Sequence, residues 1–192
     1  MKAVLIRKHG GIEALELATL PKPKAEAGQV VIKVIAAGMN HLDTWVRRGL
    51  PGLTLPLPMV PGSDAAGVVD EVGPGVTGLK PGDRVFVAPG FSCGHCPECF
   101  AGNDPLCKDY GIIGEHTSGT QAEYAALPAV NVKPLPDGLS FEEGAAFALV
   151  FLTAWHMLVG RAQVRVGEDV LVHAGGSGVG TAAIQIARLH GA

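Results

Sequence analysis

The stretch Phe91-Ser92-Cys93-Gly94-His95-Cys96-Pro97-Glu98-Cys99, continued to Cys107, contains all four cysteines of the chain. Their spacing is C-x2-C-x2-C-x7-C. Four thiolates at short spacing suit a closed tetrahedral Zn²⁺ site, because soft sulfur ligands can fill all four positions of that ion. We therefore expect one structural zinc ion in a lobe over residues 91–110, held by Cys93, Cys96, Cys99 and Cys107.

Two other uses of the four cysteines stay open. An iron–sulfur cluster is the main rival, although its bacterial run has a last gap of three residues followed by Pro, whereas Cys107 follows a gap of seven and precedes Lys108. Two disulfides are possible in principle, but nothing else in the sequence suggests an oxidising compartment. A four-cysteine zinc site has no open coordination position, so this ion is expected to order a loop rather than to do chemistry.

Composition places the chain among globular proteins. Its 192 residues are 47% hydrophobic and 17% charged, with 27 Gly and 14 Pro. The net charge is −3 without a basic cluster, which argues against a nucleic-acid partner. The N-terminal apolar run is too short for a signal peptide, and we expect no membrane span, so the sequence predicts a cytoplasmic location.

Residues 1 to about 135 read as an all-β domain with one inserted metal lobe. β-Branched runs and turn residues predict the strands. A helix capped by Asn40 and ended by Gly49 is expected between two of them. The expected strands are residues 2–6, 15–17, 29–38, 64–72, 84–87, 121–127 and 131–134.

The pattern changes near residues 136–138. Ser140 and Glu143 form a capping box, which predicts a helix from Ala145 to Val159. A buried parallel-type strand is expected at Val170–His173, followed by a glycine-rich turn and a helix from Thr181 to His190.

The order strand, glycine turn, helix is the context that a dinucleotide-binding fingerprint requires. Read as G-x-G-x-x-G, the turn offers Gly175, Ser177 and Gly180, with serine in place of the middle glycine. A purely structural turn is the alternative. We expect NAD or NADP to bind here, with the backbone near Gly178 and Val179 facing the pyrophosphate. The strand that would choose between the two cofactors is absent, so we interpret the chain as the N-terminal portion of a longer enzyme.

These residues resemble the medium-chain dehydrogenase/reductase superfamily, which includes zinc-type alcohol dehydrogenases and quinone oxidoreductases. The likeness covers the whole chain and rests on the four-cysteine lobe and on residues 38–43, 61–67, 81–85, 119–124 and 170–180. It implies a mainly β GroES-like catalytic domain at 1–138, with the zinc lobe at 91–110, then the start of an α/β Rossmann domain at 139–192. The active site would lie in the cleft between them.

Departures from the family pattern indicate the subclass. The positions that match the catalytic-zinc ligands of alcohol dehydrogenases are Asn40, Ser63 and Leu149, and the position of the proton-relay hydroxyl is Leu42. The pattern instead resembles the zinc-free quinone oxidoreductases. By the same resemblance, His41 matches a residue near the cofactor pyrophosphate and Thr153 one that contacts the nicotinamide.

Three functional hypotheses follow. The first is an NAD(P)H-dependent reductase of quinones or enones, a small-molecule carbonyl substrate, with Asn40 as oxyanion donor and Asp43 orienting its surroundings. The second is a metal-dependent alcohol dehydrogenase that recruits ligands such as Asp64 or His41. The third applies to the 192-residue chain alone, which would be a zinc-binding domain without turnover. The family resemblance also implies a homo-oligomer, a dimer or tetramer.

Simple structural roles compete with these assignments. Asn40 can be only a helix cap, and Asp43 only a satisfied buried carboxylate. Thr153 can bond back inside its own helix, and His41 can be a surface histidine.

Overall fold

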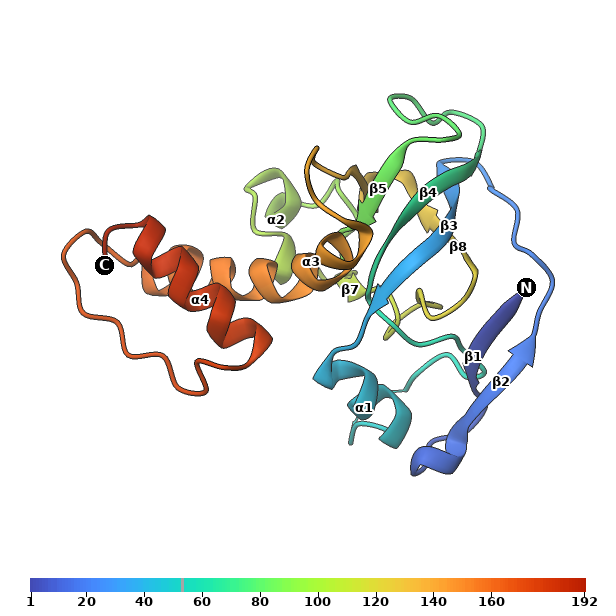
Figure 1. Cartoon of the computed structure of the whole chain (residues 1–192), viewed down its shortest axis with the longest axis horizontal. Helices are drawn as coiled ribbons and strands as arrows, with labels where there is room; N and C mark the ends of the chain where they lie inside the picture. Colours follow the sequence, from blue (N-terminus) through green and yellow to red (C-terminus); the bar gives the residue numbers. More distant parts are fainter. Residues whose placement is uncertain (53) are drawn as a thin grey trace. The chain divides into compact units, whose positions relative to one another are not determined.

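The computed structural model describes residues 1–52 and 54–192 and divides into two compact units, Met1–Ala146 (unit 1) and Phe147–Ala192 (unit 2). Unit 1 is built on β-sheet and contains the cysteine lobe, whereas unit 2 is helical among the described residues (Figure 1). The division falls within helix α3 (Phe141–Trp155). The boundary at residue 138 that the sequence suggests remains a prediction about the domains.

A five-stranded antiparallel sheet forms the centre of unit 1 (Figure 1), in the order β8–β3–β4–β5–β9. Its strands are β3 (Gln29–Gly38), β4 (Asp64–Val72), β5 (Arg84–Val87), β8 (Tyr124–Pro128) and β9 (Val132–Pro134). Their inward side chains form the main core, where Val30, Ile32, Val85 and Val87 are fully buried. Burial alternates along β5 and β8, whereas Val30, Val31 and Ile32 of β3 are all buried, and β-branched side chains pack well on such a pleated surface.

Two short sheets accompany the main one. Strand β1 (Lys2–Ile6) pairs antiparallel with β2 (Leu15–Thr19), and β6 (Gly90–Phe91) pairs with β7 (Gly111–Ile112) at the base of the cysteine lobe. The described residues of unit 1 also form short 3₁₀ turns: η1 (Ile12–Ala14), η2 (Asp104–Leu106) and η3 (Ala129–Asn131).

Helix α1 (His41–Arg48) follows β3 directly, with Asn40 at its N-cap and Gly49 at its C-cap as the sequence predicts. Its Val46 joins Ile6 and Met59 in a small buried cluster. Its N-cap and first turn carry Asn40 and Asp43, the two residues that the sequence predicts to be catalytic.

Unit 2 contains the second part of α3, a π-helical segment η4 (His156–Ala162) and α4 (Gly178–Leu189). Ala154 of α3 and Ala182 and Ile186 of α4 share one buried cluster, so the two helices pack against each other (Figure 1). The predicted capping box of α3 is confirmed: Glu143 donates its amide to Ser140 Oγ at 3.1 Å, and Ser140 donates its amide to Glu143 Oε2 at 2.8 Å.

The strand predicted at Val170–His173 is wrong for this structure, because these residues have no strand pairing. A buried parallel strand is held by hydrogen bonds to neighbouring strands, and the described residues of unit 2 provide none. The helix predicted at residues 145–159 starts earlier, at Phe141, and changes to the wider η4 at His156.

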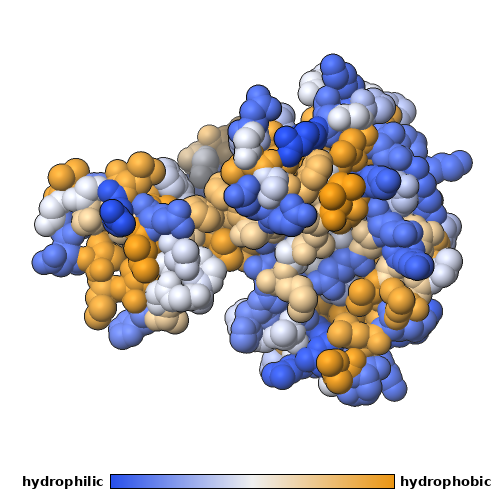
Figure 2. Space-filling view, viewed as in Figure 1, coloured by the Kyte–Doolittle hydropathy of each residue, from blue (hydrophilic) through white to orange (hydrophobic). Residues whose placement is uncertain are grey.

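Apolar side chains remain on the surface of unit 2 (Figure 2), among them Leu152, Trp155 and Met157, each about half exposed. By length and composition alone, one helical segment of the described chain, Phe141–Ala162, could cross a membrane. A single segment of this kind is weak evidence, and Glu142 and Glu143 occupy its first turn.

Candidate functional site

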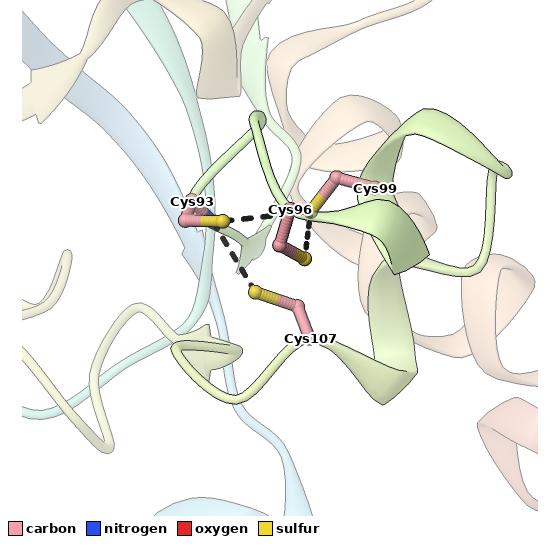
Figure 3. Close-up of side chains that lie close together, drawn as sticks. All are labelled: Cys93, Cys96, Cys99 and Cys107. Carbon is pink, nitrogen blue, oxygen red and sulfur yellow. Dashed lines mark hydrogen bonds between the residues drawn. The ribbon is translucent and has the colours of Figure 1, made fainter.

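The four cysteines converge at one point of the lobe (Figure 3), and their sulfur atoms all lie within 4.8 Å of one another. Cys93 Sγ lies 3.9 Å from Cys99 Sγ, and Cys96 Sγ lies 3.5 Å from Cys99 Sγ. In a tetrahedral Zn²⁺ site with bonds of about 2.3 Å, neighbouring sulfurs are about 3.8 Å apart. The four side chains therefore fit a zinc ion, whereas a disulfide would need two sulfurs at about 2 Å.

Local backbone geometry brings the ligands together. Cys96 precedes the short helix α2 (Pro97–Phe100), which carries Cys99, and Cys107 follows η2. The amides of Cys93 and Asp109 donate to Cys107 Sγ at 3.5 and 3.4 Å, which holds this side chain toward the other three cysteines.

The thiols differ in acidity. The Ser92 side chain, helped by the Cys96 thiol, lowers the pKa of Cys99 to about 7. The amide of Cys99 lowers the pKa of Cys96, but desolvation and the neighbouring thiols outweigh it and raise that pKa to about 11. The cluster thus contains one thiol that ionises readily near neutral pH, as metal uptake by thiolates requires.

The lobe has almost no apolar core of its own. Phe100 and Leu106 are 79% and 61% exposed. At its base, however, Asn131 is 2% exposed and its Nδ2 donates to Ala88 O at 2.7 Å and to Gly90 O at 2.6 Å. Order within the lobe therefore depends on the cysteine cluster, while its base is fastened independently.

A second polar cluster lies where β3 and β4 meet α1. Asn40 Nδ2 donates to Asp64 Oδ2 at 2.9 Å, and the Asn40 amide donates to Asp43 Oδ2 at 2.7 Å. Gly38 pairs with Asp64 in the sheet register, which explains why residues 24 apart in the sequence meet. The structure thus brings together Asn40 and Asp43, the two residues that the sequence predicts to be catalytic, and places Asp64 beside Asn40.

Burial governs this second cluster. Asp43, Ser63 and Asp64 are 7%, 0% and 2% exposed. Burial raises the pKa of Asp43, and its hydrogen bond with the Asn40 amide only partly offsets that rise. Asp43 Oδ1 and Ser63 Oγ have no hydrogen-bond partner in the described structure.

His41 does not join this cluster. Its ring is exposed and lies against the ring of Trp45, with centroids 5.3 Å apart. Leu42 is partly buried and packs against the Ile6–Val46 cluster. Leu42 therefore has a packing role, and its side chain has no hydroxyl group that could relay a proton.

The glycine-rich turn of unit 2 leads into the capped N-terminus of helix α4 (Gly178–Leu189). Ser177 caps α4, and its Oγ accepts from the Gly180 amide at 3.0 Å. A Cβ on Gly180 would lie 2.3 Å from Ala174 O, so glycine is required for this close approach. The amides of Gly178 and Val179, at the start of the helix, have no intrahelical acceptor and are suited to a phosphate.

Two other residues expected near the cofactor lie in the same unit. Gly175 accepts from Thr181 Oγ1 at 3.2 Å through its carbonyl, which tightens the turn. Thr153 is half-buried in α3, and the described residues include no side-chain hydrogen bond for it. Its role stays a prediction.

The sequence did not single out Thr120 or Asn131, and it mentioned Asp64 only as a possible metal ligand. All three are buried polar residues in otherwise apolar or glycine-rich surroundings. Their partners are far away in the sequence, so only burial of a polar residue inside a predicted strand or turn could have drawn attention to them.

Comparison with known proteins identifies the family. The family model for the alcohol dehydrogenase GroES-like domain matches residues 26–137. The chain is 38% identical to quinone oxidoreductase of Rattus norvegicus and 36% identical to alcohol dehydrogenase of Geobacillus stearothermophilus, over 100% of its length and 50% and 56% of theirs.

Solved structures agree with this assignment. An NAD-dependent alcohol dehydrogenase superposes with a TM-score of 0.95 at 56% identity, covering 100% of this chain and 56% of that one. A cobalt- and zinc-bound thermostable alcohol dehydrogenase from Pyrobaculum aerophilum superposes with a TM-score of 0.92 at 40% identity, covering 100% of this chain and 57% of that one. The chain thus spans about half the length of the relatives it matches. It belongs to the alcohol dehydrogenase GroES-like domain family, within the medium-chain dehydrogenase/reductase superfamily.

Proposed function

We propose that this chain is the N-terminal part of an NAD(P)H-dependent oxidoreductase that reduces a conjugated carbonyl compound, a quinone or an enone, without a catalytic zinc ion. The observation that carries the proposal is the hydrogen bond from Asn40 Nδ2 to the buried Asp64 carboxylate at 2.9 Å. It orients a neutral hydrogen-bond donor at a position where zinc-type relatives are expected to place a metal ligand.

Asn40 has the chemistry of an oxyanion donor. Its Nδ2 carries two hydrogens, and Asp64 accepts one of them. The second has no protein acceptor within the described part of the chain and is available to a substrate carbonyl oxygen. A donor that is oriented before the reaction stabilises developing negative charge without a cost of reorganisation.

Asp43 supports this donor through the backbone. Its carboxylate accepts from the Asn40 amide at 2.7 Å, which fixes the start of α1 and so the origin of the Asn40 side chain. Asp43 is buried and need not touch the substrate to act in this way.

The helix N-terminus in unit 2 is the proposed cofactor site. The amides of Gly178 and Val179 and the capped turn from Gly175 to Gly180 would hold the pyrophosphate of NAD or NADP, with Thr153 and His41 as further contacts. The nicotinamide, when bound, supplies the hydride. The zinc ion of the cysteine lobe would be structural, because all four of its ligands come from the protein.

A zinc-dependent alcohol dehydrogenase is the second candidate. It is favoured by the relatives named alcohol dehydrogenases and by the buried Asp64 carboxylate, which is an oxygen ligand next to Asn40. Against it, the cysteine cluster is the one group of three or more His, Cys, Asp or Glu side chains in the described chain that is placed to share a metal ion.

Activity and metal content of the full-length enzyme separate the two candidates. We expect oxidation of NADH or NADPH with a quinone or an enone, and one zinc ion per chain. Replacing Asn40→Ala should lower kcat by about 10²- to 10³-fold, the usual cost of one oxyanion donor. The control Asn103→Ala changes an exposed lobe residue and should leave kcat unchanged. A second zinc ion per chain with alcohol oxidation, or an unchanged kcat in Asn40→Ala, would refute the proposal.

Three expectations stay predictions alongside it. The 192-residue chain alone should show no turnover, because it spans about half the length of the relatives. The second expectation is that the full-length protein forms a homo-oligomer, and the third is that it is cytoplasmic.

A further inference from the structure

The segment after the cysteine lobe, residues 113–121, fastens the loop that carries Ser63 and Asp64. Three successive amides of this segment donate to three neighbouring carbonyls of the loop: Gly119 to Val60 at 2.7 Å, Thr120 to Gly62 at 3.0 Å and Gln121 to Pro61 at 3.0 Å. The two backbones therefore form one hydrogen-bonded assembly, although they are about sixty residues apart in the sequence.

Glycine lets the two backbones come this close. A Cβ on Gly119 would lie 2.0 Å from Gly62 O, and one on Gly114 would lie 2.3 Å from the same atom. Neither contact leaves space for a side chain, so the loop has little freedom to move relative to this segment.

Thr120 makes the one side-chain hydrogen bond across this contact in the described structure. It is 0% exposed, and its Oγ1 donates to the backbone carbonyl of Asp64 at 3.1 Å. Asp64 is 2% exposed, and its carboxylate accepts from Asn40 Nδ2. A continuous path therefore runs from the Thr120 hydroxyl through the Asp64 backbone and carboxylate to the Asn40 amide.

We propose that Thr120 is a positioning residue that sets the direction of the Asn40 amide through Asp64. The inference rests on the proposed function insofar as Asn40 is the oxyanion donor. Thr120 does not touch the substrate in this scheme. Its hydroxyl holds the first residue of β4 in place, and a shift of that residue would move the acceptor to which Asn40 Nδ2 is bound.

The hydroxyl, rather than the shape of the side chain, carries this role. Valine has nearly the volume of threonine but cannot donate, whereas serine keeps the donor and loses only the methyl group. Thr120→Val and Thr120→Ala remove the hydrogen bond, and Thr120→Ser restores it. Thr117→Val is the matched control, because Thr117 is exposed in the same segment and contributes its backbone carbonyl to Gly114.

The test observes the Asn40 side-chain amide in the ¹⁵N-labelled 192-residue chain by NMR. We expect Thr120→Val and Thr120→Ala to shift its two Nδ2 proton resonances and to raise their exchange rate with water by about two- to tenfold, as the loss of one neutral hydrogen bond implies. Thr120→Ser and Thr117→Val should reproduce the wild-type signals. Equal signals in Thr120→Val, Thr120→Ala and Thr117→Val would overturn the inference.

A measurement on the wild-type chain guards against variants that do not fold. The Thr120 hydroxyl proton should exchange slowly enough to be observed, because it is buried and hydrogen-bonded; a hydroxyl proton averaged with water would count against the proposal. In the full-length enzyme, Thr120→Val should lower kcat with little change in KM. A full-length enzyme that reduces no carbonyl compound would refute the proposed function, while the Asn40 signals would still decide the role of Thr120.

Discussion

Replacing Asn131→Ala tests whether the base of the cysteine lobe is held by one buried amide. The substitution removes two hydrogen bonds, from Asn131 Nδ2 to Ala88 O and to Gly90 O, at 2.7 and 2.6 Å. At about 1 kcal/mol net for each bond, the loss is about 2 kcal/mol. Carbonyls left without a donor add to this cost by up to about 1 kcal/mol each. Removing Asn131 Oδ1, which has no partner, offsets part of it. We expect a net loss of about 2 to 3 kcal/mol in the free energy of unfolding.

Urea denaturation of the wild type, Asn131→Ala and the control Asn103→Ala measures this difference. The control should change the free energy of unfolding by less than about 0.5 kcal/mol, because Asn103 is exposed and its side chain makes no cap hydrogen bond. Hydrogen exchange at the Ile113 amide, which donates to Pro89 O at 2.9 Å, should accelerate in Asn131→Ala. If Asn131→Ala and Asn103→Ala were equally stable, the assignment of the lobe base to this amide would be refuted.

Further predictions concern the metal, a buried acid and the glycine turn. Cys99→Ser should lose the zinc ion and loosen residues 91–110, and a full zinc equivalent by metal analysis would contradict the four-thiolate site. Burial raises the pKa of Asp43, so the folded chain binds its proton more tightly than the unfolded chain, and the stability of the wild type relative to Asp43→Asn should fall as the pH rises through and above the ordinary carboxyl range. Urea midpoints of the two proteins across this range test the sign, and a rising difference would reverse it. Gly180→Ala should cost about 1 to 3 kcal/mol in thermal or urea unfolding, because its methyl group would lie 2.3 Å from Ala174 O. Gly176→Ala, where no heavy atom lies within 4 Å of the added carbon, should cost less than half as much; equal losses would refute the argument from close contact.

Local patterns predicted much of unit 1. The strand at residues 29–38, the helix between Asn40 and Gly49 and the capping box at Ser140 appear where the sequence placed them. The cysteine cluster was predictable for the same reason, because its ligands are close in sequence and need only short turns to meet. In each case the residues that determine the local structure lie within about fifteen positions of one another in the sequence.

The polar cluster around Asn40 could not be predicted in the same way. Its contact with Asp64 depends on the register of β3 against β4, which pairs Gly38 with Asp64 after two irregularities, at Val31/Ile32 and Val34/Ala36. Each irregularity changes which residues face each other, and no local signal in either strand determines where it occurs. Periodicity therefore found the strands but could not reveal which acid receives the Asn40 amide.

In unit 2, structure that depends on neighbouring residues in the sequence can be distinguished from structure that depends on distant ones. The glycine turn keeps its form through short-range contacts: Ser177 caps the helix, Gly180 allows the approach of Ala174 O, and Thr181 holds the Gly175 carbonyl. Residues 170–173 are apolar enough for a buried strand, yet they form none, because a parallel strand exists only through its neighbours in the sheet. It follows that the phosphate-binding amides proposed here are set by the turn and helix alone.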